Sequence, residues 1–402
     1  MTEPPKPSSV LGRPSSVVFL SSADLWKYRR RGKHPAVPDR LEWTYELLHA
    51  YRAFDDPCAK FIAPRTASED ELARFHTREY IHAVKELSAI ADEASNSALP
   101  FASVRGFASA FGFGNGDNPI FPGMFEAAAL RAGGALQAAD LILLGATRTV
   151  FHYSGGQHHA RPAQTTGFCI FNDAALACFA FADRGWRVAY VDVDAHHGDG
   201  AQAAFYESDR VLTISLHETG ATLYPGTGST DEIGEDVGEG YSVNLPFLAD
   251  TEDETYLEAF HNLVPPLIRA FQPDVLVTEL GADGHYRDPL THLKLTMRAY
   301  VEIARTLRGF NLPWLALGGG GYDPLATTRA WTLMFGEMIG RAFEDELPPE
   351  FSARRGGEYL RDHDAPHIPP EVKTRAREYA NARLKQLHEL IPLLRRAADS
   401  PQ

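Results

Sequence analysis

The sequence contains little cysteine and no long apolar run. Only three cysteines occur among 402 residues, Cys58, Cys169 and Cys178. They are too few and too scattered for a disulfide framework or a zinc site built on thiolates. No apolar segment approaches the roughly 20 residues needed to span a bilayer. These absences predict a protein of a reducing compartment, cytoplasmic and without a membrane partner.

Positive charge is also in deficit. The chain carries 39 Lys and Arg against 53 Asp and Glu, a formal net charge of −14. Binding nucleic acid by its phosphates requires a basic face, so no nucleic-acid partner is expected, and a cationic or neutral substrate fits the charge better. Residues 1–15 are rich in Pro and Ser and lack the apolar segment of a signal peptide. We expect a disordered lead there.

Short apolar runs alternate with helical patterns along the rest of the chain. The expected strands are 16–20, 149–151, 188–193, 211–216, 274–280 and 313–317, and the expected helices include 124–144, 172–183, 254–270 and 295–307. Strands buried on both faces and joined by helices form parallel sheets. The sequence therefore predicts an α/β fold with three layers, α-β-α, around a mostly parallel central sheet. No linker divides the chain, and one domain is expected over 16–402.

Two local patterns predict where helices begin and end. Ser68 and Glu71 have the spacing of a capping box, which predicts a helix beginning beside Ser68. The segment 371–396 has the pattern of a long charged helix with leucines on one side. Pro392 should kink or break this helix, because proline lacks the backbone N–H that the helix needs.

Carboxylates and imidazoles follow the expected strand at 188–193. Asp192, Asp194 and His196 alternate along the chain, so on a strand they would point to one side. An ionised carboxylate removed from water without a partner is strongly disfavoured, and a divalent cation is the simplest compensation. We expect two of these three side chains to bind one metal ion. The alternative is a loop of solvated acids with a stray pair of histidines.

Three further loops carry reactive residues after expected strands, where the functional residues of open parallel sheets collect. His158 and His159 follow two glycines, although such a pair can equally be hydrogen-bonded structure. Asp283 would complete a set of two carboxylates and one imidazole, which leaves zinc an open position, as in catalytic sites. Tyr322 follows four glycines that permit close backbone approach to a substrate. Its hydroxyl either donates to an oxyanion or simply packs.

Together these motifs resemble the zinc-dependent histone deacetylase family, and more narrowly its class I branch and the bacterial acetoin-utilization type. The motifs are Gly155–Ala160, Gly167–Cys169, Asp192–Gly200, Tyr224–Gly228, Gly281–Asp283 and Gly318–Tyr322. The resemblance implies the arginase/deacetylase-like fold. It also implies a zinc-dependent hydrolase of linear amides that removes acetyl or other short acyl groups from the lysine side chains of proteins or from a related acylated amine.

The resemblance assigns roles to single residues. The implied zinc ligands, for one ion per chain with iron(II) as the cellular alternative, are Asp194, His196 and Asp283. The implied catalytic residues are His158, His159, Asp192, Asp199 and Tyr322. Of these, His159 is the expected general base, oriented by Asp199, while Asp192 orients His158. Tyr322 would polarise the scissile carbonyl.

Further residues match a substrate tunnel, a product channel and two structural potassium sites. The implied substrate-binding residues are Gly167, Phe168, Tyr224, Leu290, Asp117, Gly320 and Gly321, and Arg40 matches an arginine near the product channel. The implied potassium ligands are Asp192, Asp194, His196, Ser215 and Leu216 in one site, and Phe205, Ser208, Val211 and Tyr241 in the other. Leu290 stands where polyamine-preferring members tend to carry an acid, which favours acyl-lysine over a dicationic amine.

Three alternative functions stay open at this point. One is an amidohydrolase of acetylpolyamines or other small N-acyl amines. Another is a binuclear manganese ureohydrolase, which would need a second acid-rich strand end of the Ser-x-Asp-x-Asp type that 278–283 does not provide. The third is a non-catalytic module that binds acyl-lysine, and it is disfavoured because every catalytic position is filled.

Overall fold

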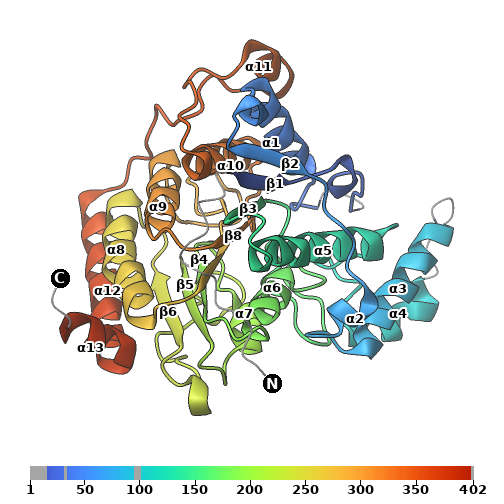
Figure 1. The fold of residues 1–402 in the computed structure, drawn as a ribbon, viewed down its shortest axis with the longest axis horizontal. Helices are drawn as coiled ribbons and strands as arrows, with labels where there is room; N and C mark the ends of the chain where they lie inside the picture. The colour runs from blue at the N-terminus through green and yellow to red at the C-terminus, as the bar shows by residue number, and fades with distance from the viewer. Residues whose placement is uncertain (1–15, 31–33, 95–100, 400–402) are drawn as a thin grey trace.

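A central parallel sheet organises the protein (Figure 1). A computed structural model describes residues 16–30, 34–94 and 101–399, so the expected lead at 1–15 lies outside the described residues. In these ranges eight strands form one sheet in the order β2-β1-β3-β8-β7-β4-β5-β6, and all neighbouring pairs are parallel. The strands are β1 (Val17–Leu20), β2 (Ala59–Ile62), β3 (Thr149–His152), β4 (Val188–Asp192), β5 (Val211–Glu218), β6 (Ser242–Phe247), β7 (Val275–Glu279) and β8 (Trp314–Leu317).

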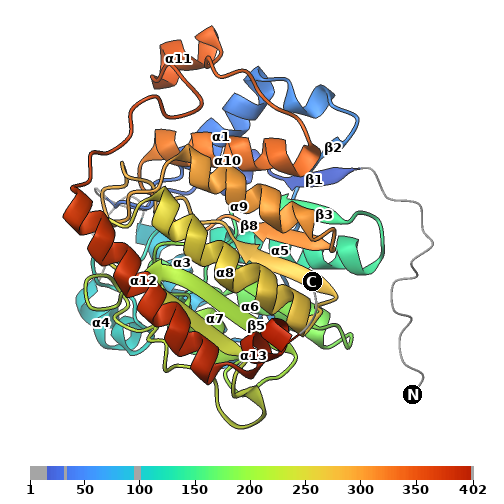
Figure 2. The same cartoon turned by 90° about the vertical axis from the view of Figure 1, so that its left-hand side faces the viewer.

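Helices cover both faces of the sheet. One face packs against α1 (Asp39–Ala50), α8 (Asp253–Phe271), α9 (Met297–Gly309), α10 (Pro324–Ile339) and α12 (Pro370–Leu390), and the other against α5 (Met124–Leu143), α6 (Asp173–Ala182) and α7 (Asp199–Ala204). Figure 2 shows α8, α9 and α10 lying over the sheet, with α12 alongside α8. The remaining helices are α2 (Glu69–Leu72), α3 (Arg78–Glu93), α4 (Phe101–Ala110), α11 (Pro349–Arg355) and α13 (Pro392–Asp399).

Successive side chains of a strand enter the two opposite layers. In β4, Ala189 and Val191 join the core on the α8 and α9 side, whereas Val188 and Tyr190 join the core with α5 and α6. Burial on both faces explains why these strands appear in the sequence as continuous apolar runs. The predicted three-layer α/β architecture with a parallel central sheet is confirmed.

The two edge strands were not predicted. β2 has two exposed residues among four, and β6 contains Pro246. Edge strands lack a neighbour on one side and tolerate polar residues and proline, so they carry no apolar run of the kind used for prediction. The local predictions are confirmed: Ser68 and Glu71 form the capping box of α2, and the C-terminal helix is broken into α12 and α13 at Pro392.

The strand order gathers the four reactive loops. β3, β8, β7 and β4 are consecutive neighbours in the middle of the sheet. Because the strands are parallel, the loops that leave their carboxyl ends meet at one edge of the sheet. These are the loops that contain His158 and His159, Tyr322, Asp283, and Asp194 with His196. Among the described residues, no helix is long and apolar enough to cross a membrane.

Candidate metal and catalytic site

Three buried side chains meet beyond the ends of β4 and β7. Asp194 and His196 lie on the loop after β4, and Asp283 lies on the loop after β7. The Nδ1 atom of His196 is 3.1 Å from Asp194 Oδ1 and 2.9 Å from Asp283 Oδ2. One ligand atom of each side chain lies within 4.8 Å of the other two. Two carboxylates buried this close together need a cation, and with the imidazole they form a donor set suited to a divalent metal.

The turn of the loop, rather than strand alternation, produces this arrangement. The predicted strand at 188–193 is too long, because β4 ends at Asp192. Asp192 Oδ1 accepts the backbone N–H of Asp194 at 3.1 Å, and Asp194 Oδ1 accepts that of His196 at 2.9 Å. Carboxylates that accept an N–H two residues further on stabilise turns. The acids therefore shape the loop that carries the metal-ligating atoms.

Glycines make room for the two carboxylates. A Cβ atom on Gly320 would lie 2.0 Å from Asp283 Oδ2, and one on Gly281 would lie 2.1 Å from Asp194 Oδ2. The N–H of Gly320 also donates to Asp194 Oδ2 at 2.6 Å. The glycines before Tyr322 were expected to admit a substrate. In the structure Gly320 lies against the carboxylates of Asp194 and Asp283, and its role in substrate binding stays a prediction.

A second possible metal group overlaps the first. Ligand atoms of His158, Asp194 and Glu279 also lie within 4.8 Å of one another. Both imidazole nitrogens of His158 already have partners, and one oxygen of the buried Glu279 carboxyl has no hydrogen-bond partner. Burial, together with nearby carboxylates, raises the pKa of Glu279 well above its usual range. A neutral Glu279 makes this group the weaker cation site.

Each of the tandem histidines is paired with a carboxylate. His158 Nδ1 lies 2.8 Å from Asp192 Oδ2, and His159 Nδ1 lies 2.7 Å from Asp199 Oδ1, at the start of α7. The two Nε2 atoms lie 3.1 Å apart. A carboxylate on Nδ1 directs the lone pair or proton of Nε2 toward the partner imidazole and the metal group.

The surroundings shift the pKa values of the two imidazoles in opposite directions. Burial and the neighbouring His158 lower the pKa of His159 to about 3. Burial also disfavours a charge on His158, but Asp192 and other nearby carboxylates raise its pKa well above the usual value. Neighbouring groups whose pKa values are pushed apart are typical of acid–base sites. At neutral pH His159 is the unprotonated member of the pair.

Tyr322 faces this group from the loop after β8. Its ring centroid lies 6.2 Å from that of His196 and 5.8 Å from that of Phe168. Asp288 Oδ2 accepts the backbone N–H of Tyr322 at 2.7 Å. Burial and the nearby Asp283 raise the pKa of Asp288 to about 7. The site therefore contains a hydroxyl donor, Tyr322, whose loop is bound by Asp288 on the loop after β7.

Residues 34–338 match the histone deacetylase domain family. The chain belongs to the histone deacetylase family. The acetoin utilization protein AcuC of Bacillus subtilis is 41% identical over 341 residues, which cover 83% of this chain and 85% of that protein. AcuC of Staphylococcus aureus is 37% identical over 345 residues, with 83% of this chain and 85% of that protein covered. The predicted relation to the bacterial acetoin-utilization type is thereby confirmed.

Two solved structures share the fold. An HDAC homolog from Aquifex aeolicus superposes with a TM-score of 0.80 at 28% identity, covering 92% of this chain and 99% of that chain. An HDAC homolog complexed with SAHA gives a TM-score of 0.81 at 29% identity, again covering 92% and 99%. Membership of the histone deacetylase family supports deacetylase activity and a metal at the buried Asp and His group.

The structure brings together only part of the substrate tunnel implied by the deacetylase family. Gly167 and Phe168 line the cavity beside His159, as does Gly320. Tyr224 is 43% exposed, and its ring centroid lies 5.0 Å from that of His159. The Gly321 carbonyl accepts a hydrogen bond from Arg40 Nη1 at 2.7 Å. These residues therefore lie near the tandem histidines, and their assignment as substrate-binding residues stays a prediction.

Four of the seven implied substrate-binding residues, Tyr224, Gly321, Asp117 and Leu290, do not line this cavity. Asp117 is exposed, and its backbone carbonyl accepts a hydrogen bond from His34. Leu290 is half-buried, and its N–H donates to Asp288. Their assignment as substrate-binding residues stays a prediction.

The implied potassium sites lie along β4, β5 and the turn before β5. Asp192 lies opposite Ser215 in the parallel register, which places the first set together. In the second set, Ser208 donates its N–H to the Phe205 carbonyl at 3.0 Å. The complete sets remain Asp192, Asp194, His196, Ser215 and Leu216, and Phe205, Ser208, Val211 and Tyr241. Potassium binding stays a prediction.

Sequence analysis missed several residues of the site. Asp173 accepts the N–H groups of Gly156 and Gln157, which fixes the loop before the tandem histidines. Arg161 Nη2 donates to Asp199 Oδ2 at 2.6 Å. Asp288 and two cavity arginines were also missed. Only one of these arginines, Arg131, had a signal, because it is the single basic residue of a mostly apolar helical pattern.

Proposed function

We propose that this protein is a zinc-dependent hydrolase that removes acetyl or another short acyl group from the lysine side chain of a protein. The observation that supports it most is the convergence of an unprotonated imidazole, His159, a hydroxyl, Tyr322, and the ligand set of Asp194, His196 and Asp283 around one cavity. Amide hydrolysis requires a base, an oxyanion donor and an activated water molecule. This site provides groups for all three.

The residues fit a single divalent ion. Asp194, His196 and Asp283 would hold it, since their ligand atoms are grouped and buried, and glycines rather than larger residues lie against the two carboxylates. When bound, zinc supplies a Lewis acid that lowers the pKa of water and polarises the substrate carbonyl. Iron(II) would suit the same ligands.

The protein's own groups then carry the proton. His159 Nε2 accepts the proton that water loses as it adds to the acyl carbonyl, while Asp199 holds the Nδ1 side of the ring. His158, paired with Asp192, keeps a positive charge beside the reaction centre. The Tyr322 hydroxyl donates to the developing oxyanion. The C–N bond then breaks, and the proton passes from His159 to the leaving amine.

The aromatic rings at the mouth suit a linear acylated amine. Phe168 lies beside Tyr322, and Tyr224 lies beside His159, so that a flexible alkyl stem can pass between two apolar walls. Gly167 would offer its carbonyl to the substrate N–H. The HDAC homolog crystallised with SAHA is consistent with a site for an extended ligand.

Hydrolysis of acetyl-lysine peptides by the zinc-loaded protein tests this function. We expect turnover that a chelator abolishes and that zinc restores. Tyr322→Phe and His159→Ala should each lose more than about 100-fold in kcat/KM, the loss typical of removing one oxyanion donor, while zinc stays bound. Turnover of acetylpolyamines in preference to peptides would instead support the small-amine alternative. Wild-type rates in either variant would refute the mechanism.

A further inference from the structure

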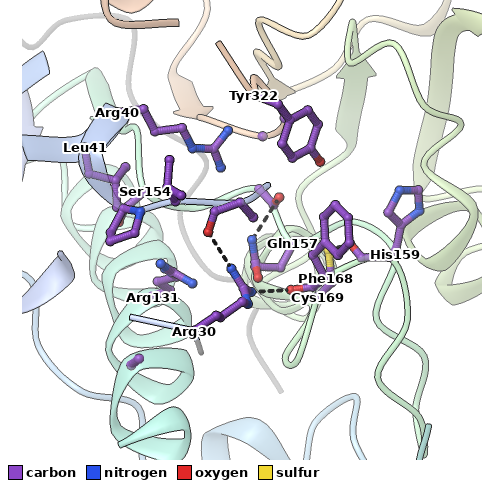
Figure 3. A pocket seen from close by; sticks show the side chains of 18 of the residues that line it. Arg30, Arg40, Leu41, Arg131, Ser154, Gln157, His159, Phe168, Cys169 and Tyr322 are labelled. Carbon is purple, nitrogen blue, oxygen red and sulfur yellow. Dashed lines mark hydrogen bonds between the residues drawn. The ribbon is translucent and has the colours of Figure 1, made fainter. Parts of the chain in front are cut away.

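A group of buried arginines lies directly beyond the reaction centre. Arg30 from the segment before α1, Arg40 from α1 and Arg131 from α5 line the same cavity as His159 and Tyr322. Figure 3 shows their guanidinium groups directed into this cavity, with Ser154 beside them. The cavity has an empty volume of about 740 Å³, including its opening to solvent. About 40 Å³ of it is open to the centres of water-sized molecules, more than one such molecule requires.

Two of the arginines are bonded to the loops that form the site. Arg30 donates to the Phe168 carbonyl at 2.8 Å and to the Ala36 carbonyl at 3.1 Å. Arg40 donates to the Gly321 carbonyl at 2.7 Å, one residue before Tyr322. The positive groups therefore adjoin the residues that would hold the acyl carbonyl.

Unused donors remain inside the cavity. Arg131 Nε and Ser154 Oγ are buried and have no hydrogen-bond partner in the part of the chain that the structure describes. Within the same residues, none of Arg30, Arg40 and Arg131 forms an ion pair with a carboxylate. Leaving a buried donor unpaired is unfavourable, and more so where the group is charged. A ligand with acceptor oxygens would remove this cost.

The local electrostatics also favour an anion. Burial and the neighbouring Arg131 lower the pKa of Arg30 to about 9, and burial and Arg40 lower that of Arg131 to about 10. Like charges that lower each other's pKa are stabilised by an opposite charge between them. The whole chain has a net charge of −14, whereas this cavity is lined by three arginines and one carboxylate, Asp194, with the buried Asp173 near Arg131. A cationic or neutral substrate, expected from the net charge, does not explain it.

We propose that this cavity binds a carboxylate at the far end of the acyl group. The enzyme would then hydrolyse amines acylated by one end of a dicarboxylic acid, such as succinyl- or glutaryl-lysine. This inference rests on the proposed function. With the scissile carbonyl at Tyr322, the acyl chain extends into the cavity, where an acetyl group ends at its methyl carbon. A chain of four or five carbons carries its carboxylate on toward Arg131. Water adds to the amide, the C–N bond breaks, the lysine amine takes the proton, and a dicarboxylate leaves.

A matched pair of substrates tests the proposal. We expect the zinc-loaded wild type to hydrolyse a succinyl-lysine peptide with a kcat/KM at least about 10-fold above that of the butyryl-lysine peptide, which has the same chain length without the charge. Arg131→Met should lower this ratio by about 10- to 100-fold, because it removes a charged donor that holds no other group. Ser154→Ala should lower it in the same direction. Using the ratio within each variant cancels general losses of folded protein.

The control is Arg184→Met, which removes an exposed arginine outside the cavity. Its succinyl-to-butyryl ratio should equal that of the wild type. If the wild type hydrolyses acetyl- and butyryl-lysine but not succinyl-lysine, the deacetylase function stands and the cavity proposal is wrong. If no acyl-lysine peptide is hydrolysed, the proposed function is wrong, and the binding measurement below decides the cavity separately.

Binding of free acids distinguishes the acyl chain from a released product. Calorimetric titration of the zinc-loaded protein should give at least about 10-fold tighter binding of succinate than of acetate, and Arg131→Met should abolish the difference. If the two acids bind with equal affinity and both bind more weakly to Arg131→Met, the cavity holds a released monocarboxylate. That result, or no effect of Arg131→Met on either acid, would overturn the proposal.

Discussion

The carboxylate of Asp288 accepts the backbone N–H of Tyr322 at 2.7 Å, and its other oxygen accepts that of Leu290 at 2.9 Å. Asp288 follows β7 and Tyr322 follows β8, and these strands are neighbours. The bond therefore ties the loop of the proposed oxyanion donor to the loop of the metal-site carboxylate Asp283. It holds the backbone of Tyr322 beside the loop after β7.

Removing this tie should slow the reaction. Asp288→Ala leaves two backbone N–H groups unpaired and frees the Tyr322 loop, so kcat should fall about 10- to 100-fold with a smaller change in KM. Asp288→Asn keeps one acceptor oxygen and should lose less. Steady-state kinetics on an acetyl-lysine peptide measure both. Equal losses in the two variants would show that the charge, rather than the hydrogen bond, is required.

The proton affinity of His159 should depend on Arg161. Burial opposes the ionisation of Asp199, but the hydrogen bond from His159 and the nearby Arg161 hold its pKa at about 2. Without Arg161, the carboxylate charge is less balanced and stabilises a protonated His159, whose pKa therefore rises. The base must be unprotonated to act, so the acidic limb of kcat/KM moves to higher pH and the loss is larger at low pH.

Solvent screening limits how far the acidic limb of kcat/KM moves when Arg161 is replaced. The Arg161 side chain is 35% exposed, and such ion pairs contribute about 0.2–1 kcal/mol, so Arg161→Gln should move the limb by less than about one pH unit. A pH–rate profile measures it. Arg161→Lys keeps the charge and should restore most of the wild-type profile. A loss that is uniform at every pH would indicate a purely structural role for Arg161.

Metal content should depend on the carboxylates of the site. We expect one tightly bound divalent ion per chain, and Asp283→Ala should reduce it severely, because one of three ligands is lost. The chelated wild type should also unfold at a lower temperature, since an ion bound at 100 times its Kd stabilises the fold by about 2.7 kcal/mol. Elemental analysis and thermal unfolding measure these effects. Asp209→Ala, at an exposed acid, is the control. Two ions per wild-type chain would favour a binuclear site.

The capping box of α2 offers a test of stability without function. Ser68 Oγ accepts the Glu71 N–H at 3.2 Å, and the Glu71 carboxylate accepts the Ser68 N–H at 2.8 Å. Ser68→Ala should reduce the free energy of unfolding by about 1 kcal/mol and leave kcat/KM unchanged. Denaturant unfolding measures the loss. A fall in activity would mean that α2 influences the site.

The sequence revealed the central strands more readily than the edges of the sheet. Runs such as 188–193 are apolar because both faces of the strand are covered, and that requirement leaves a direct trace in the residue pattern. The edge strand β2 needs no such run, and Lys60 within it is exposed. The metal-ligand residues were predictable for a related reason. Buried acids and histidines after an apolar strand are energetically unusual, so the pattern itself marks them.

Spatial relations between loops left no such trace. Asp288, Arg161 and Arg30 are ordinary charged residues in the sequence, and their positions become informative only when the segment before α1 and the loops after β3, β4 and β7 come together. The alternation at Asp192, Asp194 and His196 suggested a strand, but the structure has a turn held by the acids themselves. Hydrogen bonds from the backbone to these acids, rather than the alternation of residue types, determine the local conformation.

The sequence by itself determined the α/β class, the histidine and carboxylate residues of the site and the resemblance to deacetylases, because burial and metal binding restrict which residue types occur at single positions. The resemblance also implied the pairing of Asp192 with His158 and of Asp199 with His159. Only the tertiary structure decided which residue holds Tyr322 and that three arginines share one cavity. Those relations depend on the order of the strands in the sheet and on close approach between distant segments. Neither is encoded in the spacing of residues along the chain.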